Sequence, residues 1–175
     1  SRRGENLTTL DGVSRALPTG ALVIENGGRL IDLAGIMGGE NSAVSAKTKR
    51  VLLQAAAFDP VRIYRAARAL GVSSEASKIY AAGIDPNRTL PALERTVGLL
   101  EETAGAKRVG GLTDIYPRPV SPRKLLLRGE YARRIIGHEI SPQFYRALWK
   151  RLGFKAAPHR AGWLVEIPTA RRDIE

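Results

Sequence analysis

Residues 51–86 read VLLQAAAFDPVRIYRAARALGVSSEASKIYAAGIDP, and this stretch decides the fold. Its first eight residues are almost wholly apolar, which is typical of a strand covered on both faces. A helix is predicted directly after them, because Asp59 can cap it, Pro60 suits its first position and Gly71 can end it. A buried strand joined to a capped helix indicates a domain that mixes α and β structure.

The residues on either side extend this mixed pattern. Before the stretch, three short apolar runs are separated by Asp-Gly and Asn-Gly-Gly turns, which predicts strands at 7–10, 21–24 and 30–34. After it, residues 91–103 carry apolar side chains at helical spacing, and Gly105 follows as a stop signal.

Three prolines in YPRPVSP, residues 116–122, block both helix and central strand and therefore predict a linker. We expect one domain over residues 1–118 and a second over residues 119–175. The second contains a predicted strand, two helices, and a hairpin with strands at 154–157 and 162–167, which is the order of a winged-helix module. The expected fold class is α+β, a mixed α/β domain followed by a small winged-helix-like domain.

Charge is distributed unevenly along the chain. The 175 residues carry a formal net charge of +11, and residues 120–175 hold 12 Lys and Arg against 5 Asp and Glu. Such a basic excess predicts a polyanionic partner such as nucleic acid, or equally a solubilising surface. The candidate nucleic-acid contacts are Arg133, Arg134, Lys150 and Arg151.

Composition excludes several classes of chemistry. Cysteine is absent, which removes disulfides and thiolate metal sites, and two histidines are too few for a zinc cluster. No apolar run approaches the roughly 20 residues that span a bilayer, and the first residues lack the pattern of a signal peptide. We therefore expect a cytosolic compartment and no membrane partner.

Three features are candidates for a binding site. The glycine-rich residues 34–45, AGIMGGENSAVS, do not form a phosphate loop, but they predict either a tight turn or a close approach of a ligand to the backbone. Gln54 is a polar residue in an apolar run, and its amide needs a partner in the core or on a ligand. Ser73, Ser74 and Ser77 suit a helix start, and the absence of a nearby histidine argues against a serine nucleophile.

Three segments taken together resemble one family. They are LTTLDGVSRAL, LAGIMGGENSAVSAKTKRVLLQAAAFDPVRIYRAARALGVSSEASKIYAAGIDP and LGFKAAPHRAGWLVEIPTARRDIE. Their order and spacing are similar to those of the β subunits of bacterial phenylalanine–tRNA ligase, from within the B3/B4 region through most of the B5 domain. The resemblance implies an enzyme that charges tRNA with phenylalanine using ATP and magnesium. It also implies an α2β2 assembly in which the α subunit holds that active site.

In this family the B3/B4 region carries an editing site, which hydrolyses tyrosine wrongly joined to the tRNA for phenylalanine. A pocket built for an apolar ring rejects an added hydroxyl by only about 100-fold, so a second selection step is needed. The resemblance implies that a tyrosine-binding pocket is lined by Gly35, Gly38, Gln54, Ser74 and Ala76, with no catalytic side chain in this chain. Hydrolysis would then use a positioned water and backbone N–H groups directed at the oxyanion.

Some residues depart from the family pattern. Gln54 stands where the family typically has a glutamate that binds the tyrosine hydroxyl, and Ile79, Ala81 and Ala82 replace charged residues around Tyr80. These departures predict that editing is weakened or re-tuned. The alternative is a non-catalytic, architectural and RNA-binding module with a degenerate pocket.

The last residues, PTARRDIE, resemble the start of the family's magnesium site, where Asp173 matches the first acidic ligand. The other acidic residues of that motif have no counterpart in this sequence. We therefore expect no cofactor on this chain alone, and magnesium and ATP only in the longer enzyme.

Overall fold

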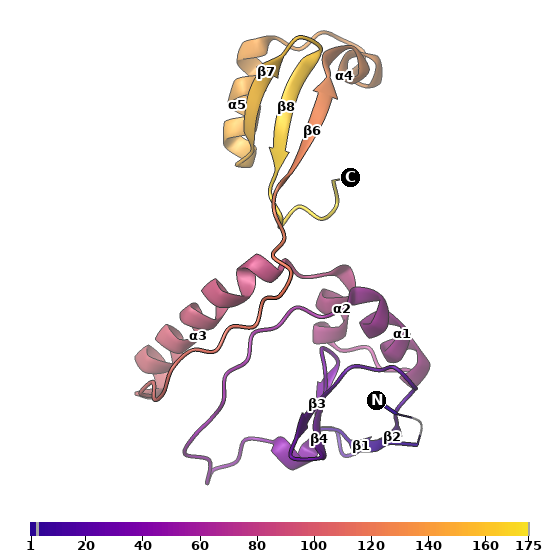
Figure 1. Ribbon diagram of the computed structural model, residues 1–175, viewed down its shortest axis with the longest axis vertical. Coiled ribbons are helices and arrows are strands. Elements are labelled where there is room, and N and C mark those ends of the chain that lie inside the picture. The colour runs from indigo at the N-terminus through magenta and orange to yellow at the C-terminus, as the bar shows by residue number, and fades with distance from the viewer. Residues whose placement is uncertain (3, 175) are drawn as a thin grey trace. The chain divides into compact units, whose positions relative to one another are not determined.

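The computed structural model describes residues 1–2 and 4–174 and separates them into two units, one ending at Asp114 and the other beginning at Ile115. Each unit combines helices with small antiparallel sheets (Figure 1), so the predicted α+β class is confirmed. Among the described residues, no helix has both the length and the apolar character needed to cross a bilayer.

Glycine-bearing turns fold the start of the first unit into antiparallel hairpins. Gly12 lies in the turn between β1 and β2, and Gly27 and Gly28 join β3 to β4. All three glycines have positive φ angles that L side chains rarely adopt. Both predicted turns are present, and β5 pairs with β4 to complete a three-stranded sheet. The strands are β1 (Asn6–Thr8), β2 (Ser14–Ala16), β3 (Val23–Asn26), β4 (Arg29–Leu33) and β5 (Met37–Gly38).

The local sequence predicts the bounds of the first helix of this unit and the end of the last, which begins at Thr89, two residues before the predicted start at 91. The carboxylate of Asp59 accepts hydrogen bonds from the N–H groups of Val61 and Arg62 at 2.9 and 3.0 Å, and Gly71 ends the first helix with φ +63°. Gly105 ends the last helix in the same left-handed conformation. The helical segments are η1 (Glu40–Ser42), α1 (Pro60–Leu70), α2 (Glu75–Ala82), η2 (Pro86–Arg88) and α3 (Thr89–Ala104).

One apolar core connects the strands of this unit to α1. Ile63 and Ala66 on the buried face of α1 belong to the same cluster as Leu33 and Ile36, with Ile63 only 1% exposed and Leu33 fully buried. Burying a side chain the size of Ile63 or Leu33 stabilises the fold by about 1.5–3 kcal/mol. The glycine-rich turn after β4 is thereby fixed against α1.

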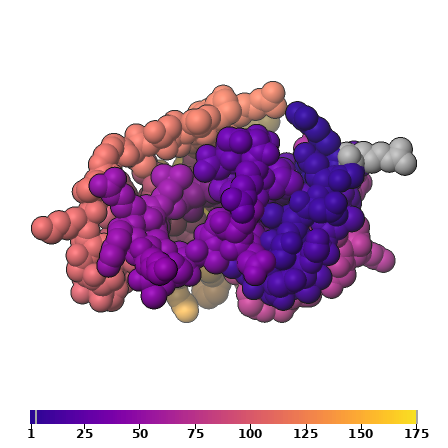
Figure 2. Space-filling view, turned by 90° about the horizontal axis from the view of Figure 1, so that it is seen from below, coloured from indigo at the N-terminus to yellow at the C-terminus, as the bar shows by residue number. Residues whose placement is uncertain are grey.

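The strand predicted at residues 51–58 is wrong. This segment is irregular, with Val51 56% and Leu52 96% exposed. A strand requires a neighbouring ladder to satisfy its N–H and C=O groups, and none of the described strands pairs with these residues. In Figure 2 the violet residues that follow η1 extend away from the indigo N-terminal strands.

The second unit has the predicted winged-helix order of strand, two helices and hairpin. Its sheet has the strand order β6-β8-β7, and the residues that form its core are Ala132, Tyr145, Phe154, Trp163, Val165 and Ile167. The hairpin strands are longer than predicted on the β7 side, so the connecting turn is shorter than PHRAG. The elements are β6 (Arg123–Arg128), α4 (Gly129–Ile136), α5 (Pro142–Leu152), β7 (Lys155–His159) and β8 (Gly162–Ile167).

Candidate functional site

A cavity of about 230 Å³ lies in the first unit, where the glycine-rich turn meets α2. For comparison, an engineered cavity of roughly 150 Å³ accepts benzene. The space is therefore sufficient for one substituted aromatic ring. The residues that line it are Asp32, Gly35, Ile36, Met37, Gly38, Gln54, Ala56, Phe58, Ala76 and Tyr80.

Gly35 allows two aromatic rings to pack on the backbone of the turn. A Cβ added at Gly35 would lie 3.1 Å from Phe58 Cδ2, from Tyr80 Cγ and from Ile63 Cδ1, and its φ of +68° is unfavourable for other residues. The rings of Phe58 and Tyr80 have centroids 5.0 Å apart and are tilted by 45°. Together they form an apolar wall against which a planar ligand can pack.

Gly38 also lines the cavity. It pairs with Asp32 across β4 and β5, and a Cβ built on it would lie 3.1 Å from Leu10 Cδ1. The N–H of Gly35 has no hydrogen-bond acceptor within the described part of the chain. Gly35, which lines the cavity, therefore has no Cβ to keep a ligand from its backbone and has an N–H group without an acceptor among the described residues.

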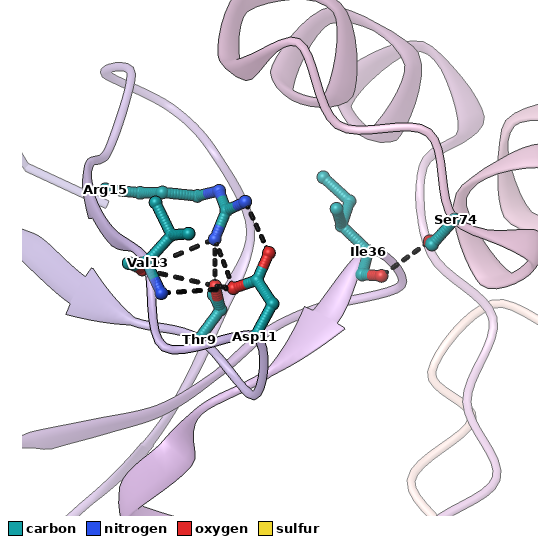
Figure 3. A network of polar contacts seen from close by, with 6 residues as sticks. All are labelled: Thr9, Asp11, Val13, Arg15, Ile36 and Ser74. Carbon is teal, nitrogen blue, oxygen red and sulfur yellow. Dashed lines mark hydrogen bonds and ion pairs between the residues drawn. The ribbon is translucent and has the colours of Figure 1, made fainter.

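Ser74 fixes the cavity wall instead of lining the cavity. Its hydroxyl donates to the carbonyl oxygen of Ile36 at 2.6 Å and accepts from the N–H of Ser77 at 3.0 Å, while the Ser77 hydroxyl accepts from the N–H of Ser74 (Figure 3 shows the Ser74–Ile36 bond). This reciprocal pair is a capping box that begins α2. Ser74 therefore positions α2, which carries Ala76 and Tyr80, against the glycine-rich turn.

Gly35, Gly38, Gln54 and Ala76 thus line one cavity, whereas Ser74 does not. Gln54 is exposed, not the buried amide expected from its apolar neighbours, because residues 51–58 do not form a covered strand. Its amide stands where the cavity meets solvent and is free to donate to or accept from a ligand.

Asp32 also lines the cavity, although the sequence alone did not identify it as a site residue. Burial raises the pKa of its carboxyl group, because the charged form loses hydration. Burial, followed by the negative charge of Asp32, raises the pKa of the Tyr80 phenol. A lone acid in the apolar run LIDLAGI was the available signal, but it gives no indication that this strand lies beside Tyr80.

Asp173 does not form a metal site with the residues described. The guanidinium of Arg171 donates to both of its carboxylate oxygens, at 2.8 and 2.7 Å, and these hydrogen bonds lower the pKa of Asp173 to about 2. No group of three or more potential ligands occurs in the described residues. This arrangement does not fit magnesium, which requires several oxygen ligands.

The four basic candidates in the second unit have different surroundings. Arg133 is ion-paired with Glu139 at 3.2 Å, and the guanidinium of Arg134 lies 5.4 Å from the ring centroid of Tyr131. Lys150 and Arg151 are exposed in the last turn of α5 and make no ion pair with any residue that the structure describes. These two are therefore the more available for a polyanion.

Comparison with protein families gives the class to which the fold and site belong. Residues 1–105 match the model of the B3/4 domain, and residues 125–175 match that of the tRNA synthetase B5 domain. Because the first match covers more than half of the chain, the chain belongs to the B3/4 domain family.

Similar proteins define the family further. The chain is 40% identical to the phenylalanine–tRNA ligase β subunit of Geobacter sulfurreducens over 98% of its length and 22% of that protein. It is 39% and 35% identical to the β subunits of Nitratidesulfovibrio vulgaris and Thermotoga maritima, over all of this chain and 22% of each relative. The resemblance to the phenylalanine–tRNA ligase β-subunit family is confirmed, and the chain spans about a fifth of these relatives.

Proposed function

We propose that the cavity of the first unit binds the aromatic side chain of an aminoacyl ester and forms the tyrosine-editing site of a phenylalanine–tRNA ligase β subunit. The observation that carries this proposal is the 230 Å³ space between the glycine-rich turn and the paired rings of Phe58 and Tyr80. Its volume and apolar wall suit one aromatic ring. Gln54 at its edge can form a hydrogen bond with a phenolic hydroxyl.

The chemistry proposed is hydrolysis of the ester by water. The lining residues include no serine, cysteine, histidine or lysine. The carboxylate of Asp32 and the phenol of Tyr80 also line the cavity, and we propose that neither attacks the ester. We propose that the N–H of Gly35, which has no acceptor among the described residues, donates to the carbonyl oxygen as it gains negative charge. We propose that positioning, not a reactive side chain, is what these residues contribute to the reaction.

The test is deacylation of tyrosyl-tRNA by the full-length β subunit assembled with its α subunit. Ala76→Phe projects a ring into the cavity from α2 and is expected to reduce hydrolysis at least tenfold. Ile79→Phe is the matched control, because Ile79 is 58% exposed on the same helix and does not line the cavity. Equal activity of the two variants would contradict the proposal and favour an architectural role.

The same family assignment supports a proposal for the wider activity. We propose that the protein containing this chain is an aminoacyl-tRNA ligase that attaches phenylalanine to tRNA with ATP and magnesium. It would act in the cytoplasm as an α2β2 assembly, with aminoacylation carried out by the α subunit. Residues 1–118 would supply editing, and residues 119–175 would form the B5-type domain.

A second proposed function is tRNA contact by the winged-helix-like unit. The helix α5 presents Lys150 and Arg151 without ion pairs among the described residues, together with Phe144, which is 56% exposed. Replacing both basic residues by glutamine is expected to weaken tRNA retention and to reduce its dependence on salt. Phe144→Ala serves as a charge-neutral comparison, and unchanged salt dependence in the double variant would refute this contact.

A further inference from the structure

Asp32 carries the single charge among the described residues that line the cavity. Its side chain is half-buried, and no hydrogen bond or ion pair to its carboxylate is found in the part of the chain that the structure describes. A carboxylate that loses water without gaining a donor is costly to maintain. Such a group favours a ligand that supplies the missing donor.

The carboxylate of Asp32, which has no hydrogen-bond donor among the described residues, lines the same cavity as the rings of Phe58 and Tyr80, on which the ligand's ring would pack. Asp32 lies opposite Gly38 in the strand register, and its charge acts on the phenol of Tyr80. Both neighbours line the same cavity. A ligand whose ring packs on Phe58 and Tyr80 would therefore bring its polar end close to the carboxylate.

We propose that Asp32 binds the α-ammonium group of the aminoacyl ester, and that the cavity thereby selects the esterified amino acid over the free one. This inference rests on the proposed editing function and names the part of the substrate that Asp32 recognises. Esterification removes the amino acid's carboxylate, so the aminoacyl group carries a single positive charge when its α-amino group is protonated. A free amino acid retains its carboxylate, which Asp32 would repel.

The α-ammonium is a better partner for Asp32 than the phenolic hydroxyl of tyrosine. A hydrogen bond between an ammonium and a carboxylate is roughly twice as strong as one between neutral groups. The ammonium also compensates the full charge of Asp32, which a phenol cannot do. Gln54, a neutral amide in the same cavity, is the better match for the hydroxyl.

Three small ligands separate these interactions. Tyrosinamide keeps the ammonium and lacks the carboxylate, N-acetyl-tyrosinamide keeps the phenol and lacks the ammonium, and tyrosine carries both charges. At about pH 6.5, below the ordinary pKa of an α-amino group, the wild-type chain is expected to bind tyrosinamide at least tenfold more tightly than the other two. Binding would be followed by NMR chemical shifts of the chain.

Asp32→Asn preserves the shape of the side chain and removes its charge. It is expected to weaken tyrosinamide binding about tenfold or more and to leave N-acetyl-tyrosinamide unchanged. Asp114→Asn is the matched control, because Asp114 is exposed and lies outside the cavity. Asp32→Glu, which restores the charge, should recover a preference for tyrosinamide.

Three other outcomes of these binding experiments would each contradict the inference or the proposed function on which it rests. Equal weakening of tyrosinamide and N-acetyl-tyrosinamide by Asp32→Asn would mean that Asp32 binds the phenol and would overturn the inference. Equal binding of the two by the wild-type chain would overturn it without any variant, even if Asp32→Asn failed to fold. If the wild-type chain bound none of the three ligands, the proposed editing pocket itself would be refuted.

Discussion

The hydroxyl of Ser74 donates a hydrogen bond to the carbonyl oxygen of Ile36 across 38 positions of sequence, at 2.6 Å (Figure 3). The same hydroxyl caps α2. One side chain thus links the glycine-rich turn to the helix that bears Ala76 and Tyr80. We therefore expect the spacing between this turn and α2 to depend on the link.

Ser74→Ala is therefore expected to reduce the free energy of unfolding by about 2 kcal/mol, from loss of the helix cap and of the bond to Ile36. Urea unfolding followed by circular dichroism would measure the change. Ser73→Ala is the matched control, because the neighbouring Ser73 is exposed and makes no hydrogen bond among the described residues. Ser74→Thr should retain most of the stability, and a similar loss in Ser73→Ala would argue against the link.

Substitution of Gly35 would show whether the close packing of Phe58 and Tyr80 on its backbone shapes the cavity. Gly35→Ala introduces both an unfavourable positive φ and contacts at 3.1 Å with Phe58, Tyr80 and Ile63, whereas Gly71→Ala introduces a similar φ of +63° in open space. The strain costs about 1–2 kcal/mol at either site, and crowding adds to it at Gly35 alone. Denaturant unfolding of both variants should show Gly35→Ala as the less stable, and equal losses would indicate that the rings move aside freely.

The elements predicted correctly from sequence are those whose signals are local. Asp59 and Gly71 lie next to the helix that they bound, so the residues that decide its ends are neighbours in the chain. The prediction of a strand at residues 51–58 was wrong because a strand needs a neighbouring strand to pair with, and apolar composition does not reveal whether one is present. Helix ends follow from neighbouring residues, whereas sheets require distant ones.

The cavity, too, depends on residues that are distant in sequence, which local signals do not bring together. Gly35, Gly38 and Ala76 were expected there through a family resemblance, since spacing along the chain did not bring them together. Asp32 was missed because it becomes a site residue only when β4 lies beside α2, and the sequence separation between Asp32 and Tyr80 hides this proximity. A charge in an apolar strand indicates a special environment but does not identify the residues that create it.

The turn between β1 and β2 is expected to be sensitive to acid. The guanidinium of Arg15 donates to both carboxylate oxygens of Asp11 at 2.7 Å, and the Thr9 hydroxyl donates to one of them at 2.6 Å (Figure 3). These hydrogen bonds, with Arg15 the largest contributor, hold the pKa of Asp11 well below its ordinary value of 3.8. A lowered pKa in the folded state stabilises the fold above pH 3.8, and this contribution is lost as the pH falls further.

Asp11→Asn should therefore be less stable than the wild-type chain at neutral pH, and the difference should shrink as the pH falls below about 3.8. The effect will be modest because the carboxylate is exposed to solvent. Urea unfolding at a series of pH values would measure it, with Asp114→Asn as the control for general loss of a surface charge. A difference that did not change with pH would show that the ionised carboxylate is not what stabilises this turn.

Asp32 should behave in the opposite way, because burial raises its pKa above 3.8. The folded chain then holds the proton more tightly than the unfolded chain. Stability therefore falls as the pH rises from about 3.8, and the loss is complete above the raised pKa. Asp32→Asn is expected to be more stable than the wild-type chain at pH 7 and to lose this advantage at about pH 3, where both side chains are neutral. Unfolding by urea at both pH values measures this, and a destabilised variant at pH 7 would mean that the carboxylate has a stabilising partner. A gain in stability together with loss of tyrosinamide binding would indicate that Asp32 favours binding at the expense of stability.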